Sequence, residues 1–270
     1  MNNFPNPSLD RRSLLRNGGL ALSLGAIAAA CGSNRGGSTN PGRLGVADEA
    51  PTLEQAAIDD VVLLRTAQSL EHTLLAVYAA GEQAGGLGSA GDALAARFVQ
   101  DHTRHAAAIG ALITARGGEE HACANPFIID RAVDPIFAAV DGSDNVERDL
   151  LNISHAFEDL AAATFQAVTA ALSDLSLRSE LMRIGGEENR HSTALAKVIN
   201  PGAVFSPAMF GEPLENDADG FPQAYPIPSA FGQLTGINLT VGALDDEGAR
   251  FSTQLQTPAE NTFVYADQSC

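Results

Sequence analysis

The sequence predicts an all-α fold: an up-down bundle of four long helices with one long crossover, followed by a small C-terminal β and loop appendage. Hydrophobic residues make up 45% of the chain, aromatic residues make up 6%, and tryptophan is absent, a balance that favours helices over a β-sandwich. Four segments carry apolar residues at steps of three and four. Their connections are short, long and short, as expected for two helical hairpins joined by a crossover.

Capping patterns mark the expected starts of the first and third helices, and short breaks separate the helices within each hairpin. Thr52 with Gln55 is placed as a capping box for the first helix, and Asp144 with Glu147 forms a similar pattern for the third. The connection between the second and third helices has about 25 residues, enough to run extended along a whole helix. The expected helices cover residues 52–83, 91–116, 144–171 and 176–199.

The N-terminal segment has the features of an export signal. Arg11 and Arg12 precede an apolar run over residues 18–30, which resembles a twin-arginine signal, and an ordinary secretion signal is the alternative. Cys31 follows three alanines as in a lipobox, so we expect lipidation of Cys31; plain signal-peptidase cleavage at the same place is the other interpretation. Residues 1–31 are thus the expected signal and lipobox, and the protein is expected on the extracytoplasmic side of a membrane.

Composition and charge separate the remaining regions. Residues 32–51 are rich in glycine, serine, asparagine and proline, and are expected to form a flexible tether between the anchor and a bundle domain over residues 52–200. The formal net charge of −17 argues against nucleic acid and anionic lipid headgroups as partners. Cys123 and Cys270 remain after the lipobox cysteine, and an even number of thiols in an oxidising compartment predicts one disulfide between them.

The segment 201–270 is expected to be an appendage without catalytic motifs. Its proline and glycine content rises and helical periodicity stops. Residues 237–241 and 250–256 are predicted strands around an acidic turn, and residues 262–265 are a third candidate.

Ionisable residues interrupt the apolar stripe of every predicted helix at mid-height. An unpaired buried carboxylate costs several kcal/mol or loses its charge, so four such interruptions at one level call for a common cause, and a bound cation supplies one. In dimetal bundles two helices each give one Glu and two give a Glu-x-x-His pair. The predicted metal ligands are Glu71, His102, His105, Glu158, Glu188 and His191.

The ligand pattern departs from the dimetal arrangement in the second helix. Glu188 and His191 form the Glu-x-x-His pair of the fourth helix, but the second helix offers His102 and His105. Imidazole does not bridge two metals as a carboxylate does. A mononuclear site, or a loosely coupled pair, is therefore as arguable as a di-iron centre, and the extra imidazole suits Zn, Cu, Fe or Ni.

These motifs resemble the ferritin-like superfamily, and more closely its exported bacterial members. The resemblance covers residues 52–200 and is carried by four motifs: Leu70-Glu71-His72, Asp101-His102-Thr103-Arg104-His105, Phe157-Glu158-Asp159 and Glu188-Asn189-Arg190-His191. It implies a bundle that binds a transition metal, with iron as the first candidate and Mn, Zn or Cu as others. It implies no known reaction, and therefore leaves open whether the protein is an enzyme.

Two alternatives stand beside iron handling or oxidation. The carboxylates can be buried salt bridges, with Arg104 or Arg190 as partners, in a metal-free bundle that binds a protein partner at the cell envelope. The same bundle can sequester Zn or Cu without turnover. A homodimer is compatible with the sequence, which identifies no protein partner.

Four features near the predicted ligands have minor expected roles. His72 and His155 lie beside the stripe, as supporting or surface residues, and Tyr78 is a core residue or an electron donor. The pair Gly185-Gly186 precedes Glu188 and indicates a kink, a π-bulge or close helix packing.

Overall fold

The structure of the protein is a computed structural model, which describes residues 57–200 and 237–263. The chain divides into two units, Met1–Glu54 and Gln55–Cys270, and the described residues belong to the second. The expected signal and tether, with Cys31, therefore lie outside the described residues. Within the described ranges, no helix combines the length and hydropathy that a membrane span requires.

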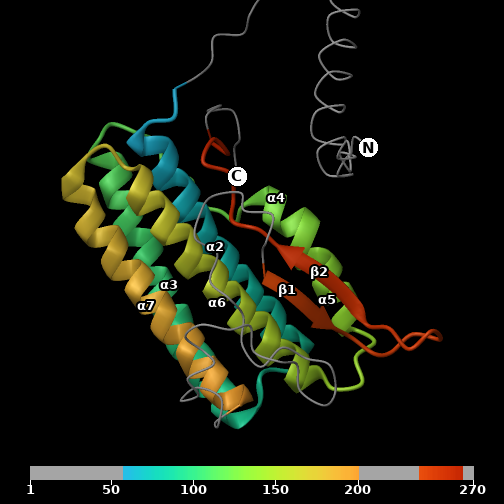
Figure 1. Cartoon of the computed structure of the whole chain (residues 1–270). Helices are drawn as coiled ribbons and strands as arrows, with labels where there is room; N and C mark the ends of the chain where they lie inside the picture. Colours follow the sequence, from blue (N-terminus) through green and yellow to red (C-terminus); the bar gives the residue numbers. More distant parts are fainter. Residues whose placement is uncertain (1–56, 201–236, 264–270) are drawn as a thin grey trace, which may run out of the picture. The chain divides into compact units, whose positions relative to one another are not determined.

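Four long helices form the bundle that the sequence predicts. The helices α2 (Asp60–Ala84) and α3 (Gly88–Thr114) make one hairpin, and α6 (Val146–Ala171) and α7 (Leu175–Ile199) make the other. They pack around a closed ring in the order α2, α3, α7, α6 (Figure 1). The mostly helical fold class is confirmed.

The first helix begins later than expected. Residues 57–59 are not helical, and the Asp59 side chain accepts a hydrogen bond from the Val62 amide at 2.9 Å. A short acceptor side chain at this position satisfies a free amide of the first turn, so the helix starts at Asp60. The predicted start at Thr52 is wrong, and Thr52 itself lies outside the described residues.

The third long helix also has a different cap from the predicted one. The Asn145 side chain accepts from the Arg148 amide at 3.1 Å, so α6 begins at Val146 and not at Asp144. Glu147 falls in the first turn, where a carboxylate favours the positive end of the helix dipole.

The crossover is helical where an extended chain was expected. It contains α4 (Pro126–Ile128), the π-turn η1 (Ile129–Val133) and α5 (Asp134–Val140) in direct succession. Pro135 has no amide hydrogen for an α-helical bond, and the π-helical segment η1 ends two residues before it. The helical form buries four apolar side chains in the core that includes α6: Ile128, Val133, Ile136 and Val140.

The C-terminal strands β1 (Ile237–Val241) and β2 (Phe251–Leu255) form an antiparallel pair, with Ile237 opposite Leu255. Alternate residues of β1 are buried where the strand packs on α6. The predicted third strand is wrong in its described part. Thr262 and Phe263 lie in a turn, because both the amide and the hydroxyl of Thr262 donate to the Ala259 carbonyl.

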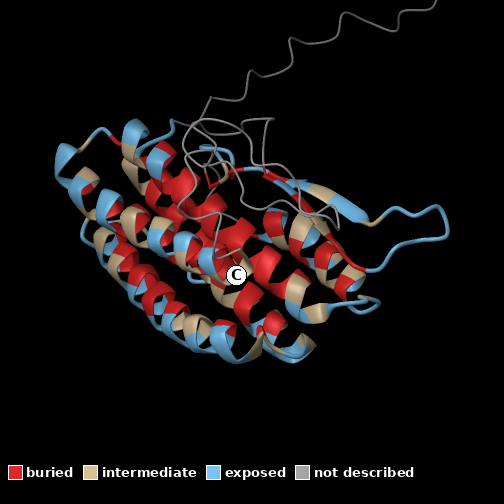
Figure 2. Ribbon diagram, turned by 60° about the horizontal axis from the view of Figure 1, so that its bottom comes forward, coloured by how far each residue is buried: buried red, intermediate tan, exposed pale blue. Residues whose placement is uncertain are grey.

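Buried residues line the facing sides of the helices (Figure 2). They form two apolar clusters, one including Leu64, Ile113 and Leu181, the other including Leu74, Phe98 and Leu195. On α3 and α7 the predicted metal ligands fall at the change from one cluster to the other, whereas on α2 and α6 Glu71 and Glu158 lie beside Leu70 and Phe157 of the second cluster. The polar residues are therefore enclosed between two apolar layers.

Candidate metal centre

The structure brings all six predicted ligands together inside the bundle. Five of them have no exposed surface, and His191 is 5% exposed. We call this group the Glu/His cluster: Glu71 on α2, His102 and His105 on α3, Glu158 on α6, and Glu188 and His191 on α7. Their role as metal ligands remains a prediction.

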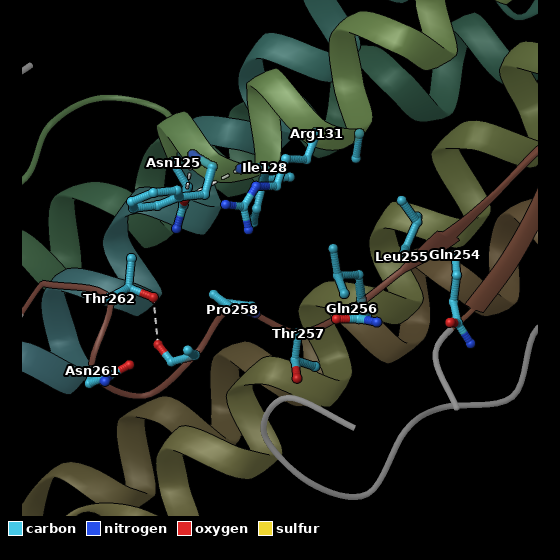
Figure 3. A pocket seen from close by; sticks show the side chains of 14 residues that line it. Asn125, Ile128, Arg131, Gln254, Leu255, Gln256, Thr257, Pro258, Asn261 and Thr262 are labelled. Atoms are coloured by element: carbon cyan, nitrogen blue, oxygen red, sulfur yellow. Dashed lines mark hydrogen bonds between the residues drawn. The ribbon is translucent and has the colours of Figure 1, made fainter. Parts of the chain in front are cut away.

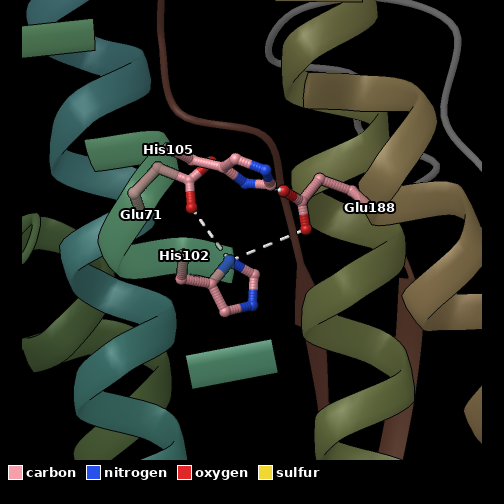
Figure 4. A group of neighbouring side chains, drawn as sticks. All are labelled: Glu71, His102, His105 and Glu188. Atoms are coloured by element: carbon pink, nitrogen blue, oxygen red, sulfur yellow. Dashed lines mark hydrogen bonds and ion pairs between the residues drawn. The ribbon is translucent and has the colours of Figure 1, made fainter. Parts of the chain in front are cut away.

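One half of the cluster lies between α2, α3 and α7. Glu71, His102, His105 and Glu188 each contribute one donor atom to a group whose members lie within 4.8 Å of one another (Figure 4). His102 Nδ1 is 2.9 Å from Glu71 Oε2, and His105 Nδ1 is 2.8 Å from Glu188 Oε1. The distance from His105 Nδ1 to Glu71 Oε1 is 3.6 Å.

The other half lies toward α6. His102, Glu158, Glu188 and His191 form a second group that meets the same 4.8 Å limit. His102 Nε2 is 3.1 Å from Glu158 Oε1. His191 Nδ1 is 3.3 Å from Glu158 Oε2 and 3.2 Å from Glu188 Oε2.

Glu188 and His102 belong to both halves in different ways. The Oε1 atom of Glu188 faces His105 while its Oε2 atom faces His191, so one carboxylate spans both groups. His102 likewise directs Nδ1 to one half and Nε2 to the other. A neutral imidazole has only one unprotonated nitrogen, however, so His102 can ligate on one side only.

Three buried atoms of the cluster lack a hydrogen bond of acceptable geometry: Glu71 Oε1, His105 Nδ1 and Glu188 Oε1. All three face one another in the first half, at the distances given above. Buried polar atoms without a well-aligned hydrogen bond are costly, and a cation among them would satisfy all three. The donor set of three carboxylates and three imidazoles thus fits a transition metal.

The salt-bridge alternative with arginine is not found. In the described part of the chain, the ion pairs of the three cluster glutamates are all with histidines. Arg104 pairs instead with Asp101 at 2.6 Å and Glu187 at 2.6 Å. Arg190 has no carboxylate partner among the described residues.

The cluster holds protons on its histidines when no metal is bound. Burial lowers the pKa of His105, but the neighbouring carboxylates of Glu188 and Glu71 outweigh this effect and raise that pKa to about 10. The same balance raises the pKa of His191 to about 9. Burial raises the pKa of Glu71, yet the neighbouring imidazoles of His102 and His105 leave that pKa below its usual value. Metal binding would therefore displace protons.

Two carboxylates that the sequence analysis does not identify contact the outward-facing ring nitrogens of His105 and His191. Glu187 Oε2 is 2.8 Å from His105 Nε2, and Asp101 Oδ2 is 3.4 Å from His191 Nε2. Arg104 contacts both carboxylates. Carboxylates in this position fix the tautomer and orientation of metal-binding imidazoles. Each directly precedes a predicted ligand in the sequence, which is the signal that could have identified them.

The neighbouring residues divide between supporting and unrelated positions. Tyr78 is buried, and its hydroxyl donates to Glu158 Oε1 at 2.5 Å. His155 is buried rather than on the surface, with its Nδ1 3.2 Å from the Ser192 hydroxyl. His72 is half-buried beside the cluster. A Cβ atom on Gly185 would lie 2.8 Å from Phe165 Cβ, so this glycine serves close packing of α7 on α6 and not a kink.

Cys123 is disulfide-bonded, and its partner lies outside the described residues. Cys270 also lies outside them, so the pairing of Cys123 with Cys270 stays a prediction. The Cys123 Sγ atom is 3.2 Å from His121 Nε2, and the His121 ring lies 4.2 Å from the Phe263 ring. This loop therefore packs on the C-terminal appendage.

A cavity in the described part of the chain lies away from the Glu/His cluster. It has a volume of about 620 Å³ and lies between α4 with η1 and the chain after β2 (Figure 3). Asn125, Ile128 and Arg131 face Pro258 and Thr262 across it. No residue of the Glu/His cluster lines this cavity, so its size says nothing about the candidate metal centre.

Comparison with known proteins gives one match. A family described as a ferritin-like domain matches residues 59–201, which covers all four long helices and every member of the Glu/His cluster. No curated protein and no solved structure matches the chain.

Proposed function

The chain belongs to the ferritin-like domain family, and from this premise we propose that its Glu/His cluster binds transition-metal ions, with iron as the first candidate. The observation that carries the proposal is the convergence of Glu71 Oε1, His105 Nδ1 and Glu188 Oε1 without hydrogen bonds of their own. The family match alone would leave the site open, since a fold hosts different functions.

We propose two unequal positions within the cluster. Glu71 with His105, and Glu158 with His191, each form a carboxylate–imidazole pair, and Glu188 reaches both. His102 completes only one position, because its neutral ring offers one free nitrogen. The position without His102 has fewer donors and binds its ion more weakly.

The surrounding residues hold the ligands in place. Glu187 and Asp101 orient His105 and His191 from outside, and the Tyr78 hydroxyl fixes Glu158. Apolar layers on both sides exclude water from the carboxylates. A bound iron would supply the one-electron chemistry that amino-acid side chains lack.

Elemental analysis tests this proposal. The full chain is purified natively, stripped of metal, and reloaded with Fe²⁺, Mn²⁺, Zn²⁺ or Cu²⁺ in separate samples. We expect at least one equivalent of iron per chain. Retention of less than about a tenth of an equivalent of every metal would reject it, because a preformed buried site of this kind binds tightly.

Sequestration of Zn or Cu without turnover is the second candidate. Three imidazoles in the ligand set favour these borderline metals more than an all-carboxylate bridge would. Oxygen uptake after anaerobic loading with Fe²⁺ separates the two functions. Uptake in proportion to the iron supports oxidation, and its absence with tight Zn²⁺ binding supports sequestration.

We also propose export of the protein and attachment to the extracytoplasmic face of a membrane through lipid on Cys31. The support is the Arg11-Arg12 pair, the apolar run and the cysteine after three alanines. Cell fractionation of the wild type and Cys31→Ala tests it. Membrane-bound wild type and a released variant are expected, whereas a soluble wild type would refute the anchor.

A further inference from the structure

A small hollow connects the Glu/His cluster with the surface. It has a volume of about 350 Å³ and lies between α3 and α7. Its floor includes His191, which is the one cluster member with any exposed surface, and Phe98, whose ring stacks on His191 at 4.0 Å. In the described part of the chain, this hollow is therefore the nearest approach of solvent to the cluster.

Arginines dominate the rim of the hollow. Arg97, Arg104 and Arg190 line it, and we call it the arginine hollow. The chain as a whole has 33 acidic and 16 basic residues, so a rim with three arginines runs against the general charge.

The two carboxylates in the hollow do not cancel this character. Asp101 lies 2.7 Å from Arg97 and 2.6 Å from Arg104. Glu187 lies 2.6 Å from Arg104 and 2.6 Å from Arg183. Each carboxylate thus already has two guanidinium partners.

Arg190 is in a different position. Its side chain is exposed, it lines the hollow, and no described carboxylate pairs with it. Guanidinium groups bind the oxygens of phosphate-like and carboxylate anions through paired hydrogen bonds. The volume suits an anion of a few atoms with its water, and is too small for a macromolecular segment.

We propose that the arginine hollow binds a small oxyanion, and that anions of this class are the substrates or effectors that reach the His191 side of the cluster. Binding of the anion depends on Arg190, with Arg97 and Arg104 completing the positive rim. This inference names the molecules admitted to the site and rests on the proposed metal function for their role. The binding itself depends only on residues that are present without metal.

The test is titration of inorganic phosphate into the metal-free full chain at low ionic strength, followed by calorimetry. We expect one saturable site, and a loss of affinity of roughly tenfold or more in Arg190→Gln, as for a charge-assisted hydrogen bond. Arg131→Gln is the matched control. Arg131 is also exposed and lacks a described carboxylate partner, but it lines the distant cavity.

Each result of this titration either supports or overturns oxyanion binding in the arginine hollow. Unchanged phosphate affinity in Arg131→Gln, with weakened binding in Arg190→Gln and equal thermal stability of both variants, supports the proposal. No saturable binding by the wild type, or an equal loss in both variants, overturns it. Because the protein carries no metal in this experiment, a failed metal-loading result does not affect it, and a failed phosphate result leaves the metal proposal intact.

Discussion

The Glu/His cluster and a second buried polar group both include side chains of α6 and α7, and the ionisable residues of the two groups respond to burial in opposite ways. In the Glu/His cluster, Glu158 and His191 keep their charges, because each lies beside an opposite charge. In the neighbouring group, burial raises the pKa of Asp159 to about 8 and lowers the pKa of His155 to about 4, so both are neutral at pH 7. The Ser192 hydroxyl donates to Asp159 and lies between the two.

The difference distinguishes a buried network from a binding site. Asp159 and His155 lose their charges, which removes most of the cost of burial without any ligand. Glu158 and His191 remain charged, because each lies beside groups of opposite charge in the cluster. Burial of charged side chains is costly, and charge that is kept in the core is the property that calls for a cation. By this property Glu158 differs from Asp159, its neighbour in the sequence.

The largest expected effect comes from the carboxylate shared by both halves of the cluster. Glu188→Gln removes the one carboxylate that reaches both proposed metal positions, and we expect metal affinity to fall by at least about a hundredfold, more than the loss of an outer carboxylate causes. Competitive titration with a chelating dye measures it. Asp159→Asn, in the neutral group, is the matched control and should bind metal as the wild type does. Equal losses in both variants would remove the distinction between the groups.

The next effect concerns pH. His105 and His191 have folded-state pKa values of about 10 and about 9, above the usual 6.5. Their ion pairs therefore stabilise the metal-free protein fully below pH 6.5, and this stabilisation is lost as pH rises toward 10. We expect the free energy of unfolding to fall on the order of 3 kcal/mol between pH 7 and pH 10. Urea denaturation measures it.

The same pH series on metal-loaded protein sharpens the comparison. Metal requires neutral imidazoles, so the loaded protein should not lose this stability toward high pH, and should gain metal affinity between pH 6 and pH 8. Parallel curves for loaded and metal-free protein would contradict the assignment of His105 and His191 as ligands.

Most of the fold follows from patterns within single helices, and so does the set of six cluster residues. The apolar periodicity predicts the four helices. The ionisable residues at mid-height on each helix predict that these side chains meet inside the bundle. The start of a helix depends on which side chain reaches a free amide of the first turn. For this reason the first helix is capped by Asp59 and not by the predicted Thr52. The helical crossover depended on apolar burial against α6, which no local pattern specifies.

The supporting shell of the site was less predictable. Asp101 points about 100° away from His102 on its own helix, as expected from helical geometry. It nevertheless lies 3.4 Å from His191, on a different helix. Contacts of this kind require the relative position of two helices, which sequence periodicity does not contain. The arginine hollow was unforeseen for the same reason.

A smaller effect is expected at the imidazole that both halves share. His102→Glu adds the carboxylate of the usual dimetal pattern, so it should load more Fe²⁺ per chain than the wild type and oxidise it faster. Anaerobic titration followed by oxygen exposure, observed by absorbance, measures both. His102→Gln, which adds no charge, is the control. Two ions per chain in both the wild type and His102→Glu would refute the unequal positions.

The smallest effect is expected in the neutral group. Asp159 is protonated at pH 6, so Asp159→Asn changes little, and we expect less than about 1 kcal/mol of lost stability there. Glu158→Gln in metal-free protein should cost more, because it removes one buried carboxylate partner from each of the charged residues His102 and His191. Thermal denaturation at pH 6 compares them, and equal costs would show that the two groups do not differ in charge.

The most direct test of the central claim is anomalous X-ray scattering from crystals of the iron-loaded chain, recorded on both sides of the iron absorption edge. The account predicts anomalous density inside the bundle within bonding distance of Glu188, with Glu71 and His105 on one side and Glu158 and His191 on the other. Density confined to the protein surface, or an empty cluster in crystals that contain bound iron, would contradict it.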